Sequence, residues 1–343
     1  MLPASYAQLH RYDGAAIERG RRGAITPCTI QPRDLQLLAA VRSHRFLTTD
    51  QLLELFWPHA KPQAGRLRLR KLFDAGCLER FRPVARRGSF PWTFHLGREG
   101  HRLLQQAGIA PASERYIQRS VYDYGRIVHD LQLNGWVLAY RRLLGEALLS
   151  WQGETDIKPP KQTRALQLRL DDNWSAEGLR DPKPRLLRPD ALLKLRGRRG
   201  APHTFLIEHD RTRRVDKNYD KFRRYDSFLC WWWRHHPTWA ERAEPPFVLF
   251  VCQDEDQCDL FLAAADRELS GHLWHPMVGS DRQLHVGRRR ILFACEIDIH
   301  DARQEAWRLP AFPPGHPRRR GRDAHVRAVR LPPAANPVHE NAA

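Results

Sequence analysis

The sequence has no long apolar run, no paired cysteine motif and too few acidic residues to balance its basic ones. No stretch approaches the roughly 18 apolar residues of a membrane-spanning helix, so no spanning helix and no membrane partner are expected. The first ten residues, MLPASYAQLH, lack the charged start and apolar core of a signal peptide. The 6 cysteines are scattered and none forms a CxxC pair. This usage is typical of reduced thiols in a cytoplasmic protein.

Basic residues outnumber acidic ones, 57 to 39, which gives the 343-residue chain a formal net charge of +18. Most of the excess is arginine, whose planar guanidinium suits phosphate better than a point charge does. A chain of this length has room for two domains. The charge predicts nucleic acid, most simply DNA, as the partner. The alternative is an arginine bias that reflects only the base composition of the genome.

The N-terminal third shows three short helical patterns, then a two-stranded hairpin, then another helix. LTTDQLLELFW offers Thr48 or Thr49 as the N-cap of the second helix. This order of elements predicts a winged helix-turn-helix DNA-binding domain. The expected divisions are a loose lead-in at 1–31, the winged helix at 32–110, a connector at 111–128, an α/β domain at 129–308 and a disordered Pro/Arg-rich tail at 309–343.

The third helix, over residues 63–76, would read DNA in the major groove, because basic side chains flank its buried leucine stripe. The residues predicted to contact DNA from this helix are Arg66, Arg68, Arg70 and Lys71. At the hairpin tip, Arg86 and Arg87 are expected to contact the phosphate backbone or the minor groove. The alternative is a solvated basic face on a winged helix that binds protein.

Two segments in the second half bring carboxylates together. RPDALLKL and TFLIEHD have strand-like composition and are joined by a short turn, so a hairpin would place Asp190 beside Glu208. Asp210, two residues after Glu208, projects from the same face of its strand. Two like charges about 4 Å apart cost on the order of 4 kcal/mol at an effective dielectric near 20. Protonation, an arginine or a divalent cation must relieve that repulsion, and oxygen ligands favour Mg²⁺ or Mn²⁺.

These segments resemble the PD-(D/E)XK nuclease superfamily, with Asp190 and Glu208 on two neighbouring strands. The resemblance implies a site in which Asp190, Glu208 and Asp210 hold Mg²⁺ and Glu154 assists. The chain departs from the pattern at position 210, where the family has a lysine. Lys221, on the following helix, is expected to supply the missing charge. The resemblance leaves two hypotheses open, an active metal-dependent endonuclease and a nuclease-like domain that only holds DNA or a partner.

Several short motifs in order, among them LTTDQLLELFW, HDLQLNGW, WQGE, RPDALL and FLIEHDRT, resemble the replication-relaxation family over roughly residues 32–300. The resemblance implies a mixed α/β protein with a winged helix followed by a restriction-endonuclease-like domain. It also implies a role in plasmid replication or conjugative mobilisation, alongside a relaxase or a replication protein. A homodimer is a further expectation, because winged helices often pair on palindromic sites. A winged-helix transcription regulator is the rival interpretation.

Overall fold

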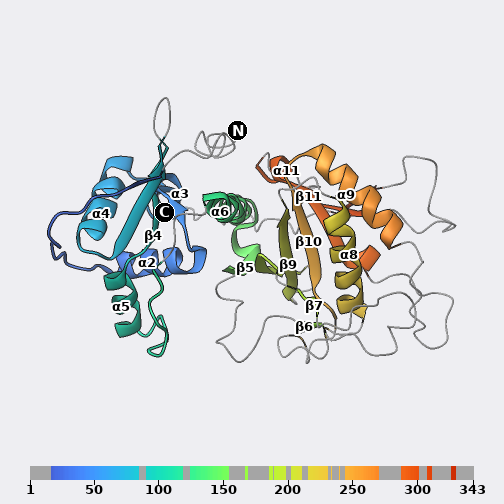
Figure 1. Ribbon diagram of the computed structural model, residues 1–343, viewed down its shortest axis with the longest axis horizontal. Coiled ribbons are helices and arrows are strands. Elements are labelled where there is room, and N and C mark those ends of the chain that lie inside the picture. The colour runs from blue at the N-terminus through green and yellow to red at the C-terminus, as the bar shows by residue number, and fades with distance from the viewer. Residues whose placement is uncertain are drawn as a thin grey trace, which may run out of the picture. The chain divides into compact units, whose positions relative to one another are not determined.

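The computed structural model describes residues 17–84, 90–118, 124–153, 167–168, 185–187, 189–197, 202–210, 215–230, 233, 239, 244–269, 287–300, 307–310 and 326–329. The chain divides into two compact units, unit 1 (Met1–Leu138) and unit 2 (Ala139–Ala343). Both units combine helices with sheet (Figure 1), so the predicted mixed α/β fold class is confirmed.

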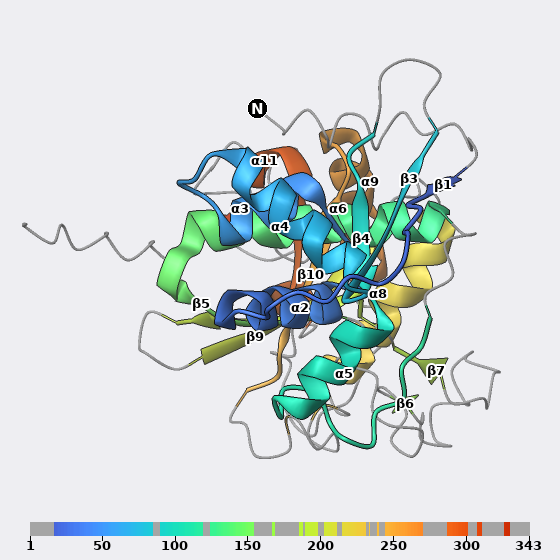
Figure 2. The same ribbon diagram turned by 90° about the vertical axis from the view of Figure 1, so that its left-hand side faces the viewer.

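Unit 1 contains a small antiparallel sheet with the strand order β1-β3-β4-β2. Figure 2 shows its strands β3 and β4 running side by side, next to helix α4. The elements follow one another as β1 (Ile17–Arg19), α2 (Pro32–His44), β2 (Leu47–Thr48), α3 (Thr49–Phe56), α4 (Pro62–Asp74), β3 (Leu78–Pro83), β4 (Thr93–Leu96) and α5 (Arg98–Gln106).

The helices of unit 1 form where the sequence predicts them, because each has an apolar stripe and a defined start. Thr48 is the N-cap of α3. Its hydroxyl accepts a hydrogen bond from the Gln51 amide, and the Gln51 side chain accepts one from the Thr48 amide. Leu38 of α2, Leu52 of α3 and Leu72 of α4 are fully buried in one core. Burial of a leucine side chain contributes about 1.5–3 kcal/mol, so this stripe fixes which side of each helix faces inward.

The expected loose lead-in is wrong for residues 17–31. Strand β1 pairs antiparallel with β3, and the amide of Gly20 donates to the carbonyl of Arg80 at 2.9 Å. Arg22 forms an ion pair of 2.9 Å with Glu79. Strand β1 has three residues and one apolar side chain, which is too short for an alternating strand pattern. The strand is recognised only from its pairing with β3, where Glu18 meets Arg82, 64 residues later. Residues 1–16 lie outside the described part of the chain.

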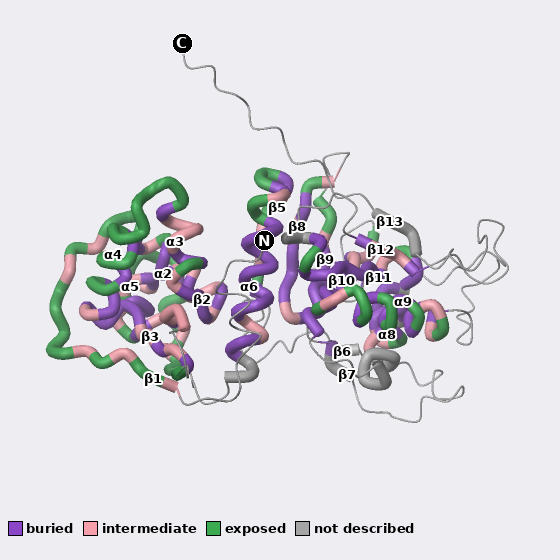
Figure 3. Tube along the Cα trace, turned by 90° about the horizontal axis from the view of Figure 1, so that it is seen from above, coloured by how far each residue is buried: buried purple, intermediate pink, exposed green. Residues whose placement is uncertain are grey.

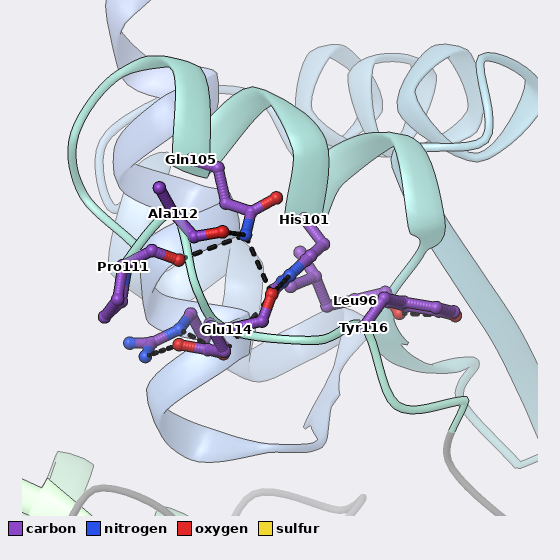
Figure 4. Close-up of polar contacts among 8 residues, drawn as sticks. Leu96, His101, Gln105, Pro111, Ala112, Glu114 and Tyr116 are labelled. Carbon is purple, nitrogen blue, oxygen red and sulfur yellow. Dashed lines mark hydrogen bonds and ion pairs between the residues drawn. The ribbon is translucent and has the colours of Figure 1, made fainter. Parts of the chain in front are cut away.

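The segment that follows α5 is held against unit 1. The side-chain amide of Gln105 donates to the carbonyls of Pro111, Ala112 and Glu114, and the ring of His101 also contacts the Glu114 carbonyl (Figure 4). The Glu114 carboxylate in turn accepts a hydrogen bond of 2.5 Å from Arg42 of α2. These contacts tie the first part of the expected connector to the helices of the same unit.

Helix α6 (Tyr124–Leu144) begins in unit 1 and crosses the division between the units. Its residues Ile127, Val128 and Leu131 pack with Phe46 and Phe81. The side-chain amide of Asn134 donates to the carbonyls of His44 and Phe46, at 2.9 and 2.7 Å. The structure therefore places the division after Leu138, within the helix, rather than after residue 128.

Unit 2 is built on a seven-stranded sheet with the order β13-β12-β11-β10-β9-β8-β5. Its strands β9, β10 and β11 are parallel, and antiparallel strands extend the sheet at both sides. The bounds of the elements are β5 (Leu148–Gly153), β6 (Gln167–Leu168), β7 (Arg185–Leu186), β8 (Ala191–Arg196), β9 (Pro202–Asp210), α8 (Val215–Cys230), β10 (Phe247–Cys252), α9 (Glu255–Glu268), α10 (Gly287–Arg290), β11 (Ile291–Cys295), α11 (Glu296–His300), β12 (Trp307–Pro310) and β13 (Val326–Val329).

The parallel strands are buried along most of their length (Figure 3), which explains why they read as continuous apolar runs. Helices α8 and α9 cover one face, where Phe222, Phe250 and Phe293 form a T-shaped and stacked aromatic cluster. Trp233 and Trp239 are buried in the same core. Strand β13 pairs with β12, so the expectation of a disordered tail is wrong for residues 326–329.

The structure bears on the expectations for membrane-spanning helices and for the cysteines. Within the described ranges, no helix combines the length and apolar character needed to span a membrane. Free thiols are found at Cys28, Cys77, Cys252, Cys258 and Cys295, and all of these except Cys28 are buried. Burial raises the pKa of Cys77 to about 12, so this thiol stays protonated and inert at neutral pH.

Candidate functional site

The carboxylates of unit 2 meet where strand β8 begins and its neighbour β9 ends. The antiparallel register pairs Ala191 with Ile207, which places Asp190 next to Glu208. The amide of Asp190 donates to the carbonyl of Ile207 at 2.8 Å, and the Asp190 carboxylate accepts from the amide of His209 at 2.8 Å. The hairpin predicted from sequence therefore brings these two acids together.

Helix α8 adds a cation and a phenol to the same place. The ammonium of Lys221 lies 2.6 Å from Oε2 of Glu208, and the hydroxyl of Tyr225 donates to Oε1 of the same carboxylate. Lys221 and Tyr225 are four residues apart, so one face of the helix presents both to the end of β9. Asp190, Glu208, Lys221 and Tyr225 are called the Glu208 cluster below.

Of the other two acids predicted for this site, the described residues include Asp210 but not Glu154. Asp210 is buried at the end of β9, and its backbone carbonyl accepts a hydrogen bond of 3.2 Å from the side chain of Gln257. Its negative charge contributes to raising the pKa of Lys221. Glu154 lies outside the described residues.

The charges of the Glu208 cluster are set by burial. Glu208 is only 1% exposed, and burial raises its pKa to about 7, although the charge of Lys221 opposes the shift. Burial alone would lower the pKa of Lys221, but the charge and hydrogen bond of Glu208, together with the charges of Asp190 and Asp210, outweigh it and the pKa is raised. Burial also raises the pKa of Tyr225 well above its usual value, so Tyr225 remains a neutral hydrogen-bond donor.

Two of the acids predicted to hold Mg²⁺ make hydrogen bonds with protein groups in this structure. Both oxygens of Glu208 already accept hydrogen bonds, from Lys221 and from Tyr225. Asp190 is engaged by the amide of His209. Within the described part of the chain, no group of three or more His, Cys, Asp or Glu side chains is arranged to hold a metal ion. Within the cluster, the ammonium of Lys221 balances the charge of the buried carboxylate, and the phenol of Tyr225 donates a hydrogen bond to it.

The titration of Glu208 predicts a pH dependence of stability. The folded chain keeps this proton up to about pH 7, whereas the unfolded chain loses it near pH 4.5. The folded state then binds more protons between these values, so the free energy of unfolding falls as the pH rises through the window. Urea unfolding of wild type and Glu208→Gln from pH 4 to 8 measures the effect. The difference in the free energy of unfolding between wild type and Glu208→Gln should change between about pH 4.5 and pH 7. If the two free energies instead vary in parallel with pH, the raised pKa of Glu208 is contradicted.

Unit 1 carries the predicted DNA-contacting residues on α4. Arg66, Arg70 and Lys71 are exposed, while Leu69 and Leu72 bury the opposite side of the helix. Arg70 forms an exposed ion pair of 2.8 Å with Asp74, one turn further along. Such a pair contributes about 0.3–0.5 kcal/mol, so a phosphate would displace it at little cost. The outward face of α4 is therefore basic and available to a ligand.

Arg68 is the exception among the predicted residues of α4. Its Nε donates to Oδ1 of Asp34 at 2.9 Å, and its guanidinium also donates to the carbonyl of Thr29 at 2.7 Å. Asp34 is 1% exposed and accepts from the amide of Gln31 at the start of α2. Because Arg68 is bound to this buried carboxylate, we do not expect it to contact DNA. Arg86 and Arg87 lie outside the described residues.

The sequence analysis did not identify Tyr225 as part of this site. The four-residue spacing from Lys221 was the available signal, because both side chains then stand on one helical face. Arg80 and Arg82 of β3 were also missed. These two residues are two positions apart on the strand, so their side chains project from the same face.

Comparison with known proteins gives one match. The model of a protein family described as replication-relaxation matches residues 38–244. This segment includes helix α4 and the whole Glu208 cluster. No curated protein and no solved structure gives a match.

Proposed function

The chain belongs to the replication-relaxation family. We propose that it binds duplex DNA through unit 1 and that unit 2 is a nuclease-like domain that does not cleave DNA. The family points to a role in plasmid replication or mobilisation. In that role the expected partners are a DNA site and a relaxase or replication protein.

The observation that carries the proposal is the outward face of α4. The element order α2, β2, α3, α4, β3, β4 is that of a winged helix-turn-helix, in which the third helix enters the major groove. Arg66 and Lys71 are exposed on this helix, with no part in the core. Guanidinium and ammonium groups at such positions reach phosphates and guanine edges. The formal net charge of +18 adds long-range attraction to a polyanion.

The non-catalytic role of unit 2 rests on the contacts of Glu208. An acid that binds a metal ion needs oxygen lone pairs that face the ion and access to the substrate. Glu208 is almost completely buried and bonded at both oxygens by side chains of α8. The cluster therefore fastens α8 to the end of β9, and the fold retains the outline of a nuclease without its chemistry.

A metal-dependent endonuclease is the second candidate, and one observation favours it. Asp190, Glu208 and Lys221 converge from two neighbouring strands and the following helix, as the PD-(D/E)XK resemblance implies. This function would require Glu208 to release Lys221 and Tyr225 in favour of an ion. The two candidates thus make opposite predictions for a plasmid substrate.

We expect the full chain to retard supercoiled plasmid on a gel in Mg²⁺ or Mn²⁺ and to leave it uncut. After removal of the protein, the plasmid should be recovered supercoiled, because the Glu208 cluster does not bind the ion. Nicked or linear product that disappears in Asp190→Asn and Glu208→Gln would instead establish the endonuclease. Absence of any retardation at low salt would refute DNA binding itself.

A further inference from the structure

Arg80 and Arg82 project from one face of β3, where they make cation–π contacts with Phe73 of α4 and with Trp92, the residue just before β4. The guanidinium carbon of Arg80 lies 4.4 Å from the ring centroid of Phe73 and 4.4 Å from that of Trp92. The guanidinium of Arg82 lies over the same Trp92 ring, also at 4.4 Å. The two aromatic rings therefore restrict the Arg80 side chain before any ligand binds. Less side-chain conformational entropy is then lost when a ligand binds.

Gly20 completes the enclosure of the Arg80 stem. Its amide donates to the Arg80 carbonyl at 2.9 Å. A Cβ at position 20 would lie 2.6 Å from Cγ and 2.8 Å from Nε of Arg80, and 3.0 Å from the ring of Phe73. Only glycine allows this approach, so the segment after β1 holds the arginine in place without adding a charge.

The charges around Arg80 are mixed, because each of its two neighbouring arginines is paired with an acid. Burial, then the neighbouring Arg70 and Arg82, lower the pKa of Arg80, against the opposing charges of Asp74 and Glu18. Arg70 is paired with Asp74, and Arg82 with Glu18 at 2.7 Å. Among the residues that the structure describes, none forms an ion pair with Arg80. Its Nε is buried and makes no hydrogen bond within those residues.

We propose that Arg80, with Arg70 and Arg82 beside it, forms a binding site for a backbone phosphate of DNA; this rests on the proposed function of unit 1. A phosphodiester supplies a counter-charge for Arg80, which has no ion-pair partner among the described residues. It would also compete with the partly exposed acids that now pair with Arg70 and Arg82. It also matches the bidentate geometry of a guanidinium that two rings hold in one plane. The site lies along the strand that leads out from α4, so it would fix the position of the helix on the duplex without reading sequence.

Arg80→Gln tests the site in the full chain, with affinity for labelled duplex DNA measured from 50 to 200 mM salt. Loss of one phosphate contact should reduce the slope of log K against log salt by about 0.9 and weaken binding about tenfold at 0.1 M salt. The loss should be equal on two duplexes of unrelated sequence, because phosphate carries no sequence information. Arg98→Gln is the matched control, since Arg98 is exposed and lies over a single ring, that of Tyr116, at 5.8 Å.

Two further variants keep the test decisive if Arg80→Gln folds poorly. Gly20→Ala retains every charge but displaces the Arg80 stem, and Arg82→Gln removes a neighbouring cation; each should also lower the salt slope. Circular dichroism verifies that each chain is folded. A folded Arg80→Gln or Arg82→Gln chain with the wild-type slope would overturn the phosphate site alone. A wild-type chain that binds no duplex would instead overturn the proposed function.

Discussion

Replacing Lys221 by methionine is expected to lower the free energy of unfolding at pH 8 by about 3 kcal/mol. Removing one partner of a buried ion pair typically costs about 3–5 kcal/mol, because the other charge remains buried without compensation. The expected loss of stability lies at the lower end of this range because water reaches part of the Lys221 side chain, which is 28% exposed. At pH 5 Glu208 takes up a proton, so the cost should shrink. Urea unfolding followed by tryptophan fluorescence measures this, since most of the 11 tryptophans lie in unit 2.

Arg223→Met is the matched control for Lys221→Met. Arg223 stands on the same helix and pairs with Glu268 at 2.6 Å, but its side chain is 46% exposed. An exposed pair of this kind contributes about 0–1 kcal/mol. Combining Lys221→Met with Glu208→Gln should recover much of the lost stability, because the buried charge is removed. If Lys221→Met unfolds at the wild-type urea concentration at pH 8, the cluster has no structural role.

Removing two charges from the outward face of α4 is expected to weaken binding to duplex DNA by about 10- to 100-fold, since a good base contact contributes about 1–3 kcal/mol and phosphate contacts add to it. The double variant is Arg66→Gln/Lys71→Gln, and neither residue takes part in the core. Fluorescence anisotropy at 0.1 M salt measures the affinity. The fold should be unaffected, because exposed substitutions usually change stability by less than about 0.5 kcal/mol.

A control of equal charge separates a specific surface from net charge. Arg98→Gln/Arg102→Gln removes two exposed arginines from α5 of the same unit, where Arg102 pairs with the nearby Glu99. This control should keep affinity within about threefold of wild type, because distant charges are screened at a Debye length of about 10 Å. Equal losses in the two double variants would refute α4 as the binding helix.

Local sequence patterns predicted much of the fold. The leucine spacing of α4 and the cap at Thr48 are properties of neighbouring residues, so they are legible without a structure. The meeting of Asp190 with Glu208 was also predictable, because a short turn between two strands leaves one antiparallel arrangement that pairs them. The sequence thus sufficed for the helices of unit 1 and for the meeting of Asp190 with Glu208.

Contacts between residues far apart in the chain were not predictable. Arg68 looks like any other basic residue of α4 until folding brings it to Asp34 of α2. Strand β13 lies in a Pro/Arg-rich segment whose composition suggests disorder, and only its pairing with β12 makes it a strand. Arg80 gained its two ring neighbours in the same way, Phe73 from α4 and Trp92 from the position just before β4. A single sequence contains no direct record of such pairings.

The most direct test of DNA binding by unit 1 is the affinity of the unmodified chain for a labelled duplex as salt rises from 50 to 200 mM. The basic face of α4 and the Arg80 site predict binding whose log K falls linearly with log salt, with about 0.9 lost per phosphate contact and several contacts in all. Binding that is independent of salt, or no binding at 50 mM, would contradict the account.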